Sequence, residues 1–166
     1  MQTPDLTEKK STRAKNAAYR LLTYRPRSRA ELIGKLQEKG FDSTVIESVL
    51  ADLERYGYVN DRQFAEQWAA GRLRLRGFGR RRVERELRDK GIERDIIAET
   101  LASVCNDDIE MRTARASAEK KLKILRSFDR ETCRRRLAAF LERKGFSYDI
   151  IRAVLTDMDE MQTVVL

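Results

Sequence analysis

The 166-residue sequence contains no histidine and only two cysteines, Cys105 and Cys133. The absence of histidine excludes a histidine general base and a histidine-ligated metal. Two cysteines cannot form a zinc site by themselves, so we interpret them as reduced thiols of a cytoplasmic protein. No nucleophile–base pair, dinucleotide loop or P-loop is present. We therefore expect a protein that is not an enzyme, with no catalytic residue, metal or cofactor.

Long apolar runs are also missing. No run approaches the roughly 20 residues that a membrane-spanning helix needs. The first five residues lack the apolar core of a signal peptide. With two prolines and eight glycines, few residues would interrupt helices. These features predict an all-helical, soluble, cytoplasmic chain without a membrane segment.

The sequence does contain an internal repeat, in which one pattern of residue types occurs three times. A Lys-Gly pair followed by an apolar residue recurs at Gly40, Gly91 and Gly145, so the glycines lie 51 and then 54 residues apart. Apolar residues keep their offsets from this glycine, and only Thr100 leaves the apolar class. A period of about 50 residues is typical of tandem supersecondary units that bury each other's apolar faces. We predict an all-α fold, a tandem array of three three-helix repeats that is elongated and curved.

The repeats divide the chain. We expect a disordered N-terminus at 1–10, then repeats at 11–57, 58–106 and 107–166. The last repeat includes a short apolar tail, 164–166, that either packs on the array or is disordered. Whether helices also pair across repeat boundaries stays open at this point.

Local signals place several helix ends. Ser28 followed by Glu31 forms a capping box, and Asn60 is another N-cap. Gly40 suits the left-handed position after a helix. The remaining pattern predicts helices at 12–24, 80–90, 94–104, 108–125, 129–144 and 147–160.

Charge is patterned as well. The net charge is +8 and the pI about 9.7, which favours a polyanionic partner, above all nucleic acid. The middle helix of each repeat is basic and the last is acidic. Arginines crowd both sides of the break at 77–79, and such crowding disfavours folding unless an anion is present. The candidate DNA- or filament-binding residues are Arg72, Arg74, Arg76, Arg80, Arg81, Arg82, Arg85, Arg88, Arg134, Arg135, Arg136, Arg143 and Lys144.

A simpler interpretation of the charges stays open. The basic middle helices could pair with the acidic last helices inside each unit, where exposed pairs contribute about 0–1 kcal/mol each. The role of five aromatic residues is open in the same way. They could stack on nucleic-acid bases, but we expect them to pack in the core or at helix caps. These residues are Tyr24, Tyr56, Tyr58, Phe78 and Tyr148. Trp68 lies in an apolar stripe and is expected in the core.

The chain resembles the bacterial RecX regulatory proteins over about residues 15–158, most strongly in the middle repeat. The resemblance rests on Tyr58-Val59-Asn60-Asp61, Phe64-Ala65, Trp68, Arg72, Gly77-Phe78-Gly79, Arg82-Val83, Glu86-Leu87 and Lys90-Gly91-Ile92. Two departures occur. Arg80 stands where the family often has proline, and Asn60 stands where it often has aspartate. Asparagine still caps a helix.

The resemblance implies a non-enzymatic modulator of the RecA recombinase. Such proteins lie along the groove of the RecA–DNA filament and damp strand exchange, ATP hydrolysis and the co-protease function behind the SOS response. The expected partners are the RecA filament and single- and double-stranded DNA, bound by a monomer with weak sequence selectivity. The basic side would face DNA phosphates or acidic filament patches, and the acidic side basic patches of RecA. Two alternatives stay open: a direct nucleic-acid-binding regulator of helix-turn-helix type, and a protein scaffold without a nucleic-acid role.

Overall fold

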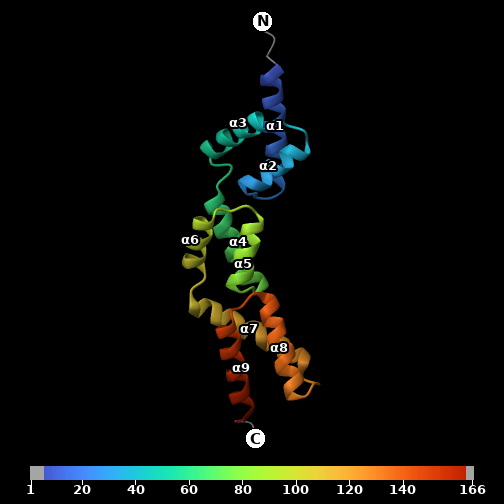
Figure 1. The fold of residues 1–166 in the computed structure, drawn as a ribbon, viewed down its shortest axis with the longest axis vertical. Coiled ribbons are helices and arrows are strands. Elements are labelled where there is room, and N and C mark those ends of the chain that lie inside the picture. Colours follow the sequence, from blue (N-terminus) through green and yellow to red (C-terminus); the bar gives the residue numbers. More distant parts are fainter. Residues whose placement is uncertain (1–5, 164–166) are drawn as a thin grey trace.

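The chain forms an elongated array of helices. The computed structural model describes residues 6–163, with side chains at 8–158. Helix α1 lies at one end of the long axis and α9 at the other (Figure 1). Nine α-helices make up the described chain: α1 (Leu6–Tyr24), α2 (Arg29–Glu38), α3 (Ser43–Arg55), α4 (Asp61–Arg76), α5 (Arg80–Asp89), α6 (Arg94–Val104), α7 (Asp107–Leu125), α8 (Arg130–Lys144) and α9 (Tyr148–Thr163).

The helices form three units with separate cores. Unit 1 is α1–α3, unit 2 is α4–α6 and unit 3 is α7–α9, and each holds its own cluster of buried apolar side chains. Leu36, Leu87 and Leu141 occupy the same repeat position and are fully buried. In the described residues, every extensive helix–helix packing joins two helices of one unit. The array is therefore built from self-packed units, and not from helices paired across repeats.

The local helix signals behave as predicted. Ser28 Oγ accepts a hydrogen bond from Glu31 N at 3.1 Å and completes the capping box. Asn60 Oδ1 accepts from Gln63 N at 3.0 Å. Gly40 adopts a φ of +80°, the left-handed conformation that glycine enters without a Cβ clash.

The N-terminal boundary differs from the expectation. Helix α1 begins at Leu6, so residues 6–10 are helical and not disordered. Lys10 forms an ion pair with Asp42 of unit 1 at 3.4 Å, a tertiary contact that the polar composition of this segment does not reveal. The predicted tail at 164–166 lies outside the described residues.

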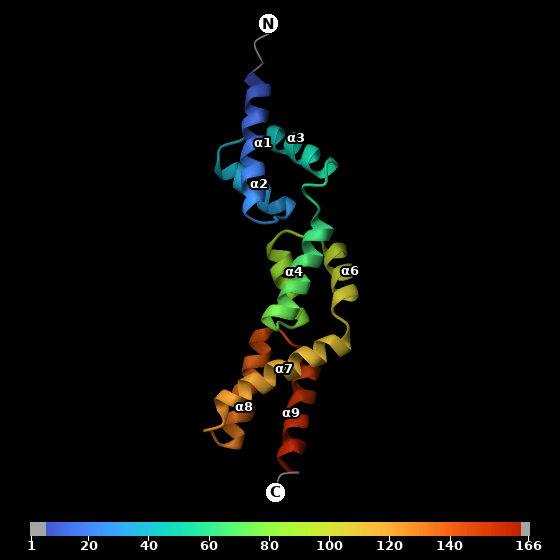
Figure 2. The ribbon, with the colours of Figure 1, turned by 180° about the vertical axis from the view of Figure 1, so that it is seen from behind.

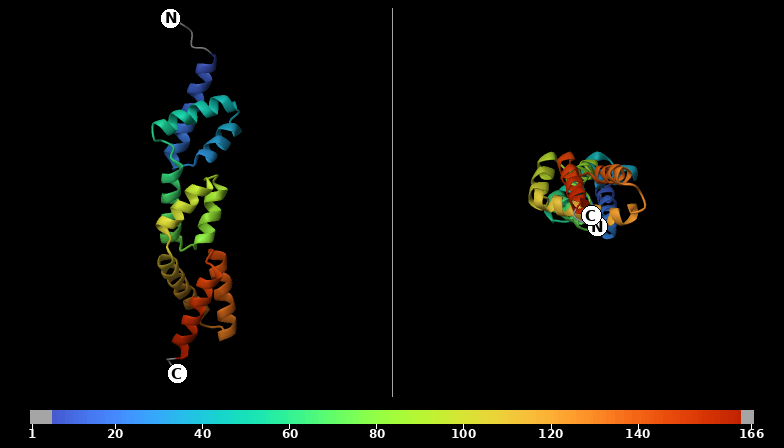
Figure 3. Two further views of the ribbon diagram at one scale, coloured as in Figure 1. Left: turned by 60° about the vertical axis from the view of Figure 1, so that its left-hand side comes forward. Right: turned by 90° about the horizontal axis from the view of Figure 1, so that it is seen from below.

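The middle helices connect the units head to tail. Joint A lies where α5 ends against the start of α2: Ser28 Oγ donates to the backbone oxygen of Lys90 at 2.6 Å. Joint B lies where α8 ends against the start of α5: the backbone nitrogen of Gly79 donates to Lys144 O at 2.8 Å, and that of Arg81 donates to Gly145 O at 3.1 Å. Helices α2, α5 and α8 consequently follow one another along one side of the array (Figure 3).

A second contact recurs in both joints. The first helix of the following unit supplies a carboxylate to the start of the preceding middle helix. In joint A, Arg29 N donates to Asp61 Oδ1 at 2.8 Å. In joint B, Arg80 N donates to Glu110 Oε1 at 3.0 Å, and Glu110 is buried. Since the first N–H groups of a helix have no partner inside the helix, each joint satisfies them with groups of the next unit.

Two glycines meet in joint B with no room for a side chain. A Cβ on Gly79 would lie 2.5 Å from the backbone oxygen of Gly145, although the φ of −83° at Gly79 suits any residue. Replacing Gly79→Ala should therefore force the units apart and destabilise the fold by about 1–3 kcal/mol. Gly34→Ala is the control, since nothing lies within 4 Å of its added Cβ inside α2, and it should stabilise by about 0.5–1 kcal/mol. Urea unfolding measures both, and equal effects of the two alanines would contradict tight packing at the joint.

Thr100 is a polar residue at a repeat position that is apolar in the other two repeats. It is buried in unit 2 at the position of Val49 and Val154, and its hydroxyl oxygen has no hydrogen-bond partner in the described part of the chain. Because an unpaired buried hydroxyl is costly, Thr100→Val should stabilise the protein by about 1 kcal/mol. The reverse change at the equivalent site, Val154→Thr, should destabilise it. Urea midpoints measure both changes, and a Thr100→Val variant less stable than wild type would overturn the prediction.

Candidate nucleic-acid and filament interface

The acidic last helices find their ion-pair partners on first helices in units 2 and 3. Arg62 of α4 pairs with Glu99 of α6, and Arg115 of α7 pairs with Asp157 of α9 at 2.8 Å. These ion pairs join the last helix to the first helix, and Arg82 and Arg88 of α5 pair with Glu86 and Glu84 of α5 itself.

Unit 1 follows the simpler interpretation. Arg29 at the start of α2 forms ion pairs with Glu47 and with Glu54 of α3, the latter at 2.9 Å. Pairing between the middle and last helices therefore occurs where the middle helix carries least positive charge.

Several candidate arginines have structural roles at joint B and the α4–α5 contact. Arg72 Nε lies 2.7 Å from Glu86 Oε2, and the guanidinium carbon lies 4.1 Å from the centroid of the Trp68 ring. Arg82 lies 3.7 Å from the centroid of the Phe78 ring and 3.4 Å from Glu86. Such cation–π contacts stabilise packing. Phe78 is therefore packed under cations, as expected, and Trp68 lies partly buried at the core edge.

Arg80 is also held inside the structure. Its Nη1 donates to the backbone oxygen of Cys105 at 3.2 Å, beside the buried carboxylate of Glu110. Burial, followed by the charge of Glu110, raises the pKa of the Cys105 thiol to about 11. This thiol stays protonated and inert near neutral pH.

The other candidate residues of α5 and α8 are exposed. Arg88 pairs with Glu84 of its own helix at 2.7 Å, and Arg136 lies 3.9 Å from the centroid of the Phe128 ring. The exposed candidates on these helices are Arg81, Arg85, Arg88, Arg134, Arg135, Arg136 and Arg143. They form the basic side of units 2 and 3.

The remaining candidates line a groove between units 2 and 3. Arg74, Arg76 and Lys144 share it with Arg112 and Lys120 of α7, and its volume is about 470 Å³. Sequence reasoning missed the two α7 residues, because α7 carries charges of both signs. The sequence does contain a signal for them: Arg112, Ala116 and Lys120 are spaced four residues apart, which places both cations on one helix face.

Exposed tyrosines contradict part of the aromatic prediction. Tyr24, Tyr56, Tyr58 and Tyr148 are 85, 60, 58 and 69% exposed, so none of them lies in the core. Tyr58 touches Tyr19 edge-on at 5.3 Å between ring centroids, but most of its surface still faces solvent. These side chains lie at or next to helix ends, where few neighbours can cover a ring.

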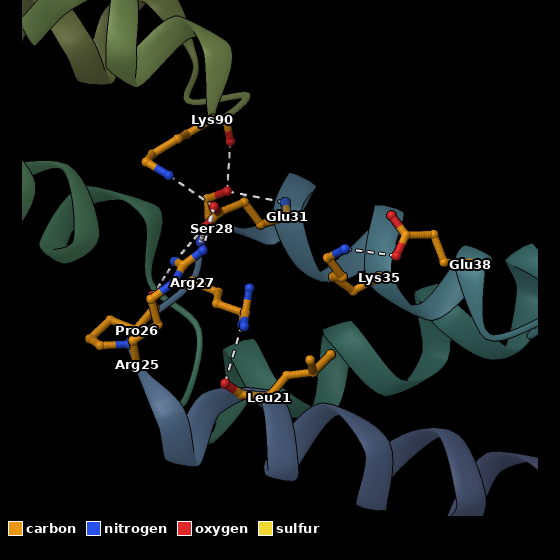
Figure 4. Close-up of polar contacts among 9 residues, drawn as sticks. All are labelled: Leu21, Arg25, Pro26, Arg27, Ser28, Glu31, Lys35, Glu38 and Lys90. Carbon is orange, nitrogen blue, oxygen red and sulfur yellow. Dashed lines mark hydrogen bonds and ion pairs between the residues drawn. The ribbon is translucent and has the colours of Figure 1, made fainter.

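Joint A is electrostatically neutralised (Figure 4). Glu31 accepts from Arg25 at 2.9 Å and from Lys90 Nζ at 2.9 Å. Burial raises the pKa of the Glu31 carboxyl, but hydrogen bonds from Arg25, Lys90 and Ser28 outweigh it and bring the pKa down to about 2. The ammonium of Lys90 also lies 4.1 Å from the centroid of the Trp68 ring. A carboxylate thus sits at the centre of a set of cations.

Two classes of site do not occur among the residues that the structure describes. No cluster of histidine, cysteine, aspartate or glutamate could hold a metal ion. No helix there has the length and apolar character needed to cross a bilayer.

The self-packed units, the head-to-tail joints and the basic side define a tandem helical-repeat protein. Three family models match it in order: the first three-helix domain of RecX at residues 14–53, the second at 60–101 and the third at 108–155. The chain belongs to the RecX family of regulatory proteins.

Similar proteins agree with this assignment. A regulatory protein RecX of Amycolatopsis mediterranei is 35% identical over 161 residues, 95% of this chain and 91% of that protein. One of Corynebacterium efficiens is 38% identical and covers 92% of this chain and 77% of that protein. The crystal structure of RecX from Lactobacillus salivarius has the same fold, with a TM-score of 0.81 at 24% identity over 91% of this chain and 97% of that chain.

The depressed pKa of Glu31 makes joint A sensitive to acid. Because the pKa of this carboxyl falls from 4.5 to about 2 on folding, its ionised form stabilises the fold above pH 4.5, and this contribution is lost as pH falls toward 2. The stability difference between wild type and Glu31→Gln should be constant from pH 7 to about 5 and should then shrink. Urea unfolding followed by Trp68 fluorescence measures it.

The exposed pair Lys35–Glu38 on the same helix supplies the control (Figure 4). Glu38→Gln should have little effect at any pH, since exposed pairs contribute little. A Glu31→Gln penalty that persisted unchanged at pH 2 would contradict the assignment.

Proposed function

We propose that this protein is a non-enzymatic regulator that binds the RecA–DNA filament in the cytoplasm as a monomer and restrains RecA recombinase, ATPase and co-protease activities. The observation that carries the proposal is membership of the RecX regulatory family over nearly the whole chain. An elongated array can contact several subunits of a helical filament at once, whereas a compact domain cannot.

The charge distribution supports a DNA contact. Helices α5 and α8, which carry the exposed arginines, lie on one side of the array (Figures 2 and 3). Arginine offers bidentate hydrogen bonds to phosphate, and phosphate contacts position a protein without reading sequence. Binding through this side is therefore salt-dependent and weakly sequence-selective.

The helix-turn-helix alternative receives less support. A recognition helix contacts base edges with its N-terminal residues in the major groove. The N-termini of α2 and α5 lie inside joints A and B, where Ser28 and Gly79 contact the Lys-Gly turn of the following unit. Of the three middle helices, only α8 has its N-terminus outside a joint. A protein that used this one recognition helix would not need three repeats.

Titration into a RecA reaction tests the proposal directly. The rate of single-strand-dependent ATP hydrolysis by RecA should fall as the full-length protein is added. Inhibition well below one protein per RecA indicates action at filament ends, and inhibition near equal amounts indicates groove coating. An unchanged rate, together with tight binding to naked DNA, would reject filament regulation.

Charge reversal identifies the interacting side. The double variant Arg81→Glu and Arg85→Glu should bind the RecA–DNA filament at least about tenfold more weakly at low salt, because both side chains are exposed on α5. The control is Lys123→Glu with Arg126→Glu at the end of α7, which changes net charge equally. Filament affinity is measured by fluorescence anisotropy. If the two doubles weaken binding to the same extent, only net charge matters and the basic side is not the contact.

A further inference from the structure

Joints A and B are built alike but carry opposite charges at one position. Each joint places the third residue of a middle helix against the Lys-Gly turn that ends the next middle helix. In joint A that residue is Glu31, which pairs with Lys90 at 2.9 Å (Figure 4). In joint B the equivalent residue is Arg82, and the equivalent lysine is Lys144. Joint B therefore has a cation where joint A has its neutralising carboxylate.

Lys144 consequently lies among like charges. Its ammonium donates to the backbone oxygen of Arg76 and lies 5.1 Å from the centroid of the Phe78 ring, which also carries Arg82. Partial burial, followed by the charges of Arg82, Lys120 and Arg76, lowers the pKa of Lys144. A lysine so placed gains more from an incoming anion than an isolated surface lysine does.

The groove at this point has the composition of an anion site. It is lined by Arg74, Arg76, Arg112, Lys120 and Lys144, and no described aspartate or glutamate lines it. Apolar side chains, including Leu75 and Phe140, form part of the same wall. Leu75 is 85% exposed, which leaves apolar surface open beside the cations. The volume of about 470 Å³ is large enough for a nucleotide-sized group.

The carboxylate of Glu110 does not fill this role. It is buried, does not line the groove, and accepts from Arg80 N at 3.0 Å. It corresponds to Asp61 of joint A, which accepts from Arg29 N, and not to Glu31. Joint B has a second carboxylate in Glu86, which pairs with Arg72 at 2.7 Å and with Arg82 at 3.4 Å, but Glu86 does not line the groove.

We propose that the groove of joint B binds a phosphate group, which neutralises Arg76, Lys120 and Lys144 as the carboxylate of Glu31 neutralises Lys90 in joint A. The ligand class is a phosphodiester or polyphosphate, held by ammonium and guanidinium groups, with its organic part against Leu75 and Phe140. The inference rests on the proposed DNA contact and gives it a location. It also makes the rigidity of the unit 2–unit 3 connection depend on the ligand, because the anion would bridge α4, α7 and α8.

The test uses the full chain without RecA. A negative result would therefore reject the phosphate site without deciding whether the protein regulates the RecA filament. Affinity for a fluorescent dT8 oligonucleotide is measured by anisotropy at several salt concentrations, and the melting temperature is measured with and without tripolyphosphate. The double variant Lys120→Gln and Lys144→Gln should bind dT8 about tenfold more weakly and reduce the salt slope by about one. Lys120→Gln alone, a surface change, should give a smaller loss in the same direction.

Two further variants sharpen the result. Lys123→Gln removes the same charge from α7 outside the groove and should leave dT8 affinity within about twofold of wild type. Arg126→Gln removes one charge just beyond the end of the same helix, also outside the groove, and should likewise leave dT8 affinity within about twofold of wild type.

The probes distinguish the two sources of phosphate. If the groove variants weaken both dT8 binding and the stabilisation by tripolyphosphate, the result supports a general phosphate site. If the groove variants weaken only dT8 binding, the result supports a phosphodiester site. If the double variant matches Lys123→Gln with both probes, the groove binds no phosphate and the inference is overturned.

Discussion

The contact between the start of one middle helix and the Lys-Gly turn that ends the next sets the form of the whole molecule. Glycine at 91 and 145 takes a positive φ, so the turn leaves the helix compactly and backbone can approach backbone. In joint B the approach pairs otherwise unpartnered N–H groups with carbonyl oxygens, and in joint A the Ser28 hydroxyl donates to the carbonyl oxygen of Lys90. Both joints set the end of one middle helix against the start of another, so the dipoles of α2, α5 and α8 run head to tail. Since each joint repeats this geometry, the units extend in one direction and their middle helices share one side (Figure 1).

Repetition of geometry does not require repetition of charge. The backbone contacts of the joints need only a helix start and a glycine turn, so the side chain three residues into the helix is free to vary. Glu31 and Arg82 use that freedom in opposite ways. One joint is closed by an internal ion pair, and the other accumulates cations beside an open groove. A structural contact and an anion-attracting surface thus arise from the same supersecondary unit.

Most of the fold was predictable because its signals are local. A cap such as Ser28 with Glu31, or a glycine such as Gly40, depends on residues within four positions along the chain. The roles of individual arginines were less predictable. Whether Arg80 or Arg82 faces solvent depends on how two units approach, and that contact joins residues about 60 positions apart. The concentration of arginine in α5 and α8 is visible in the sequence, whereas Arg112 and Lys120 do not stand out because α7 carries charges of both signs.

The order of the joints also gives the array a polarity that suits a polar filament. Every middle helix points the same way, so the two ends of the array differ: unit 1 ends in an exposed Lys39-Gly40 turn, and unit 3 ends in the start of α8, which caps itself through Asp129 and Thr132. A partner built from repeated, similarly oriented subunits would meet successive units in one orientation only. Individually weak, screened contacts then act together along the array, because binding of one unit raises the effective concentration of the next.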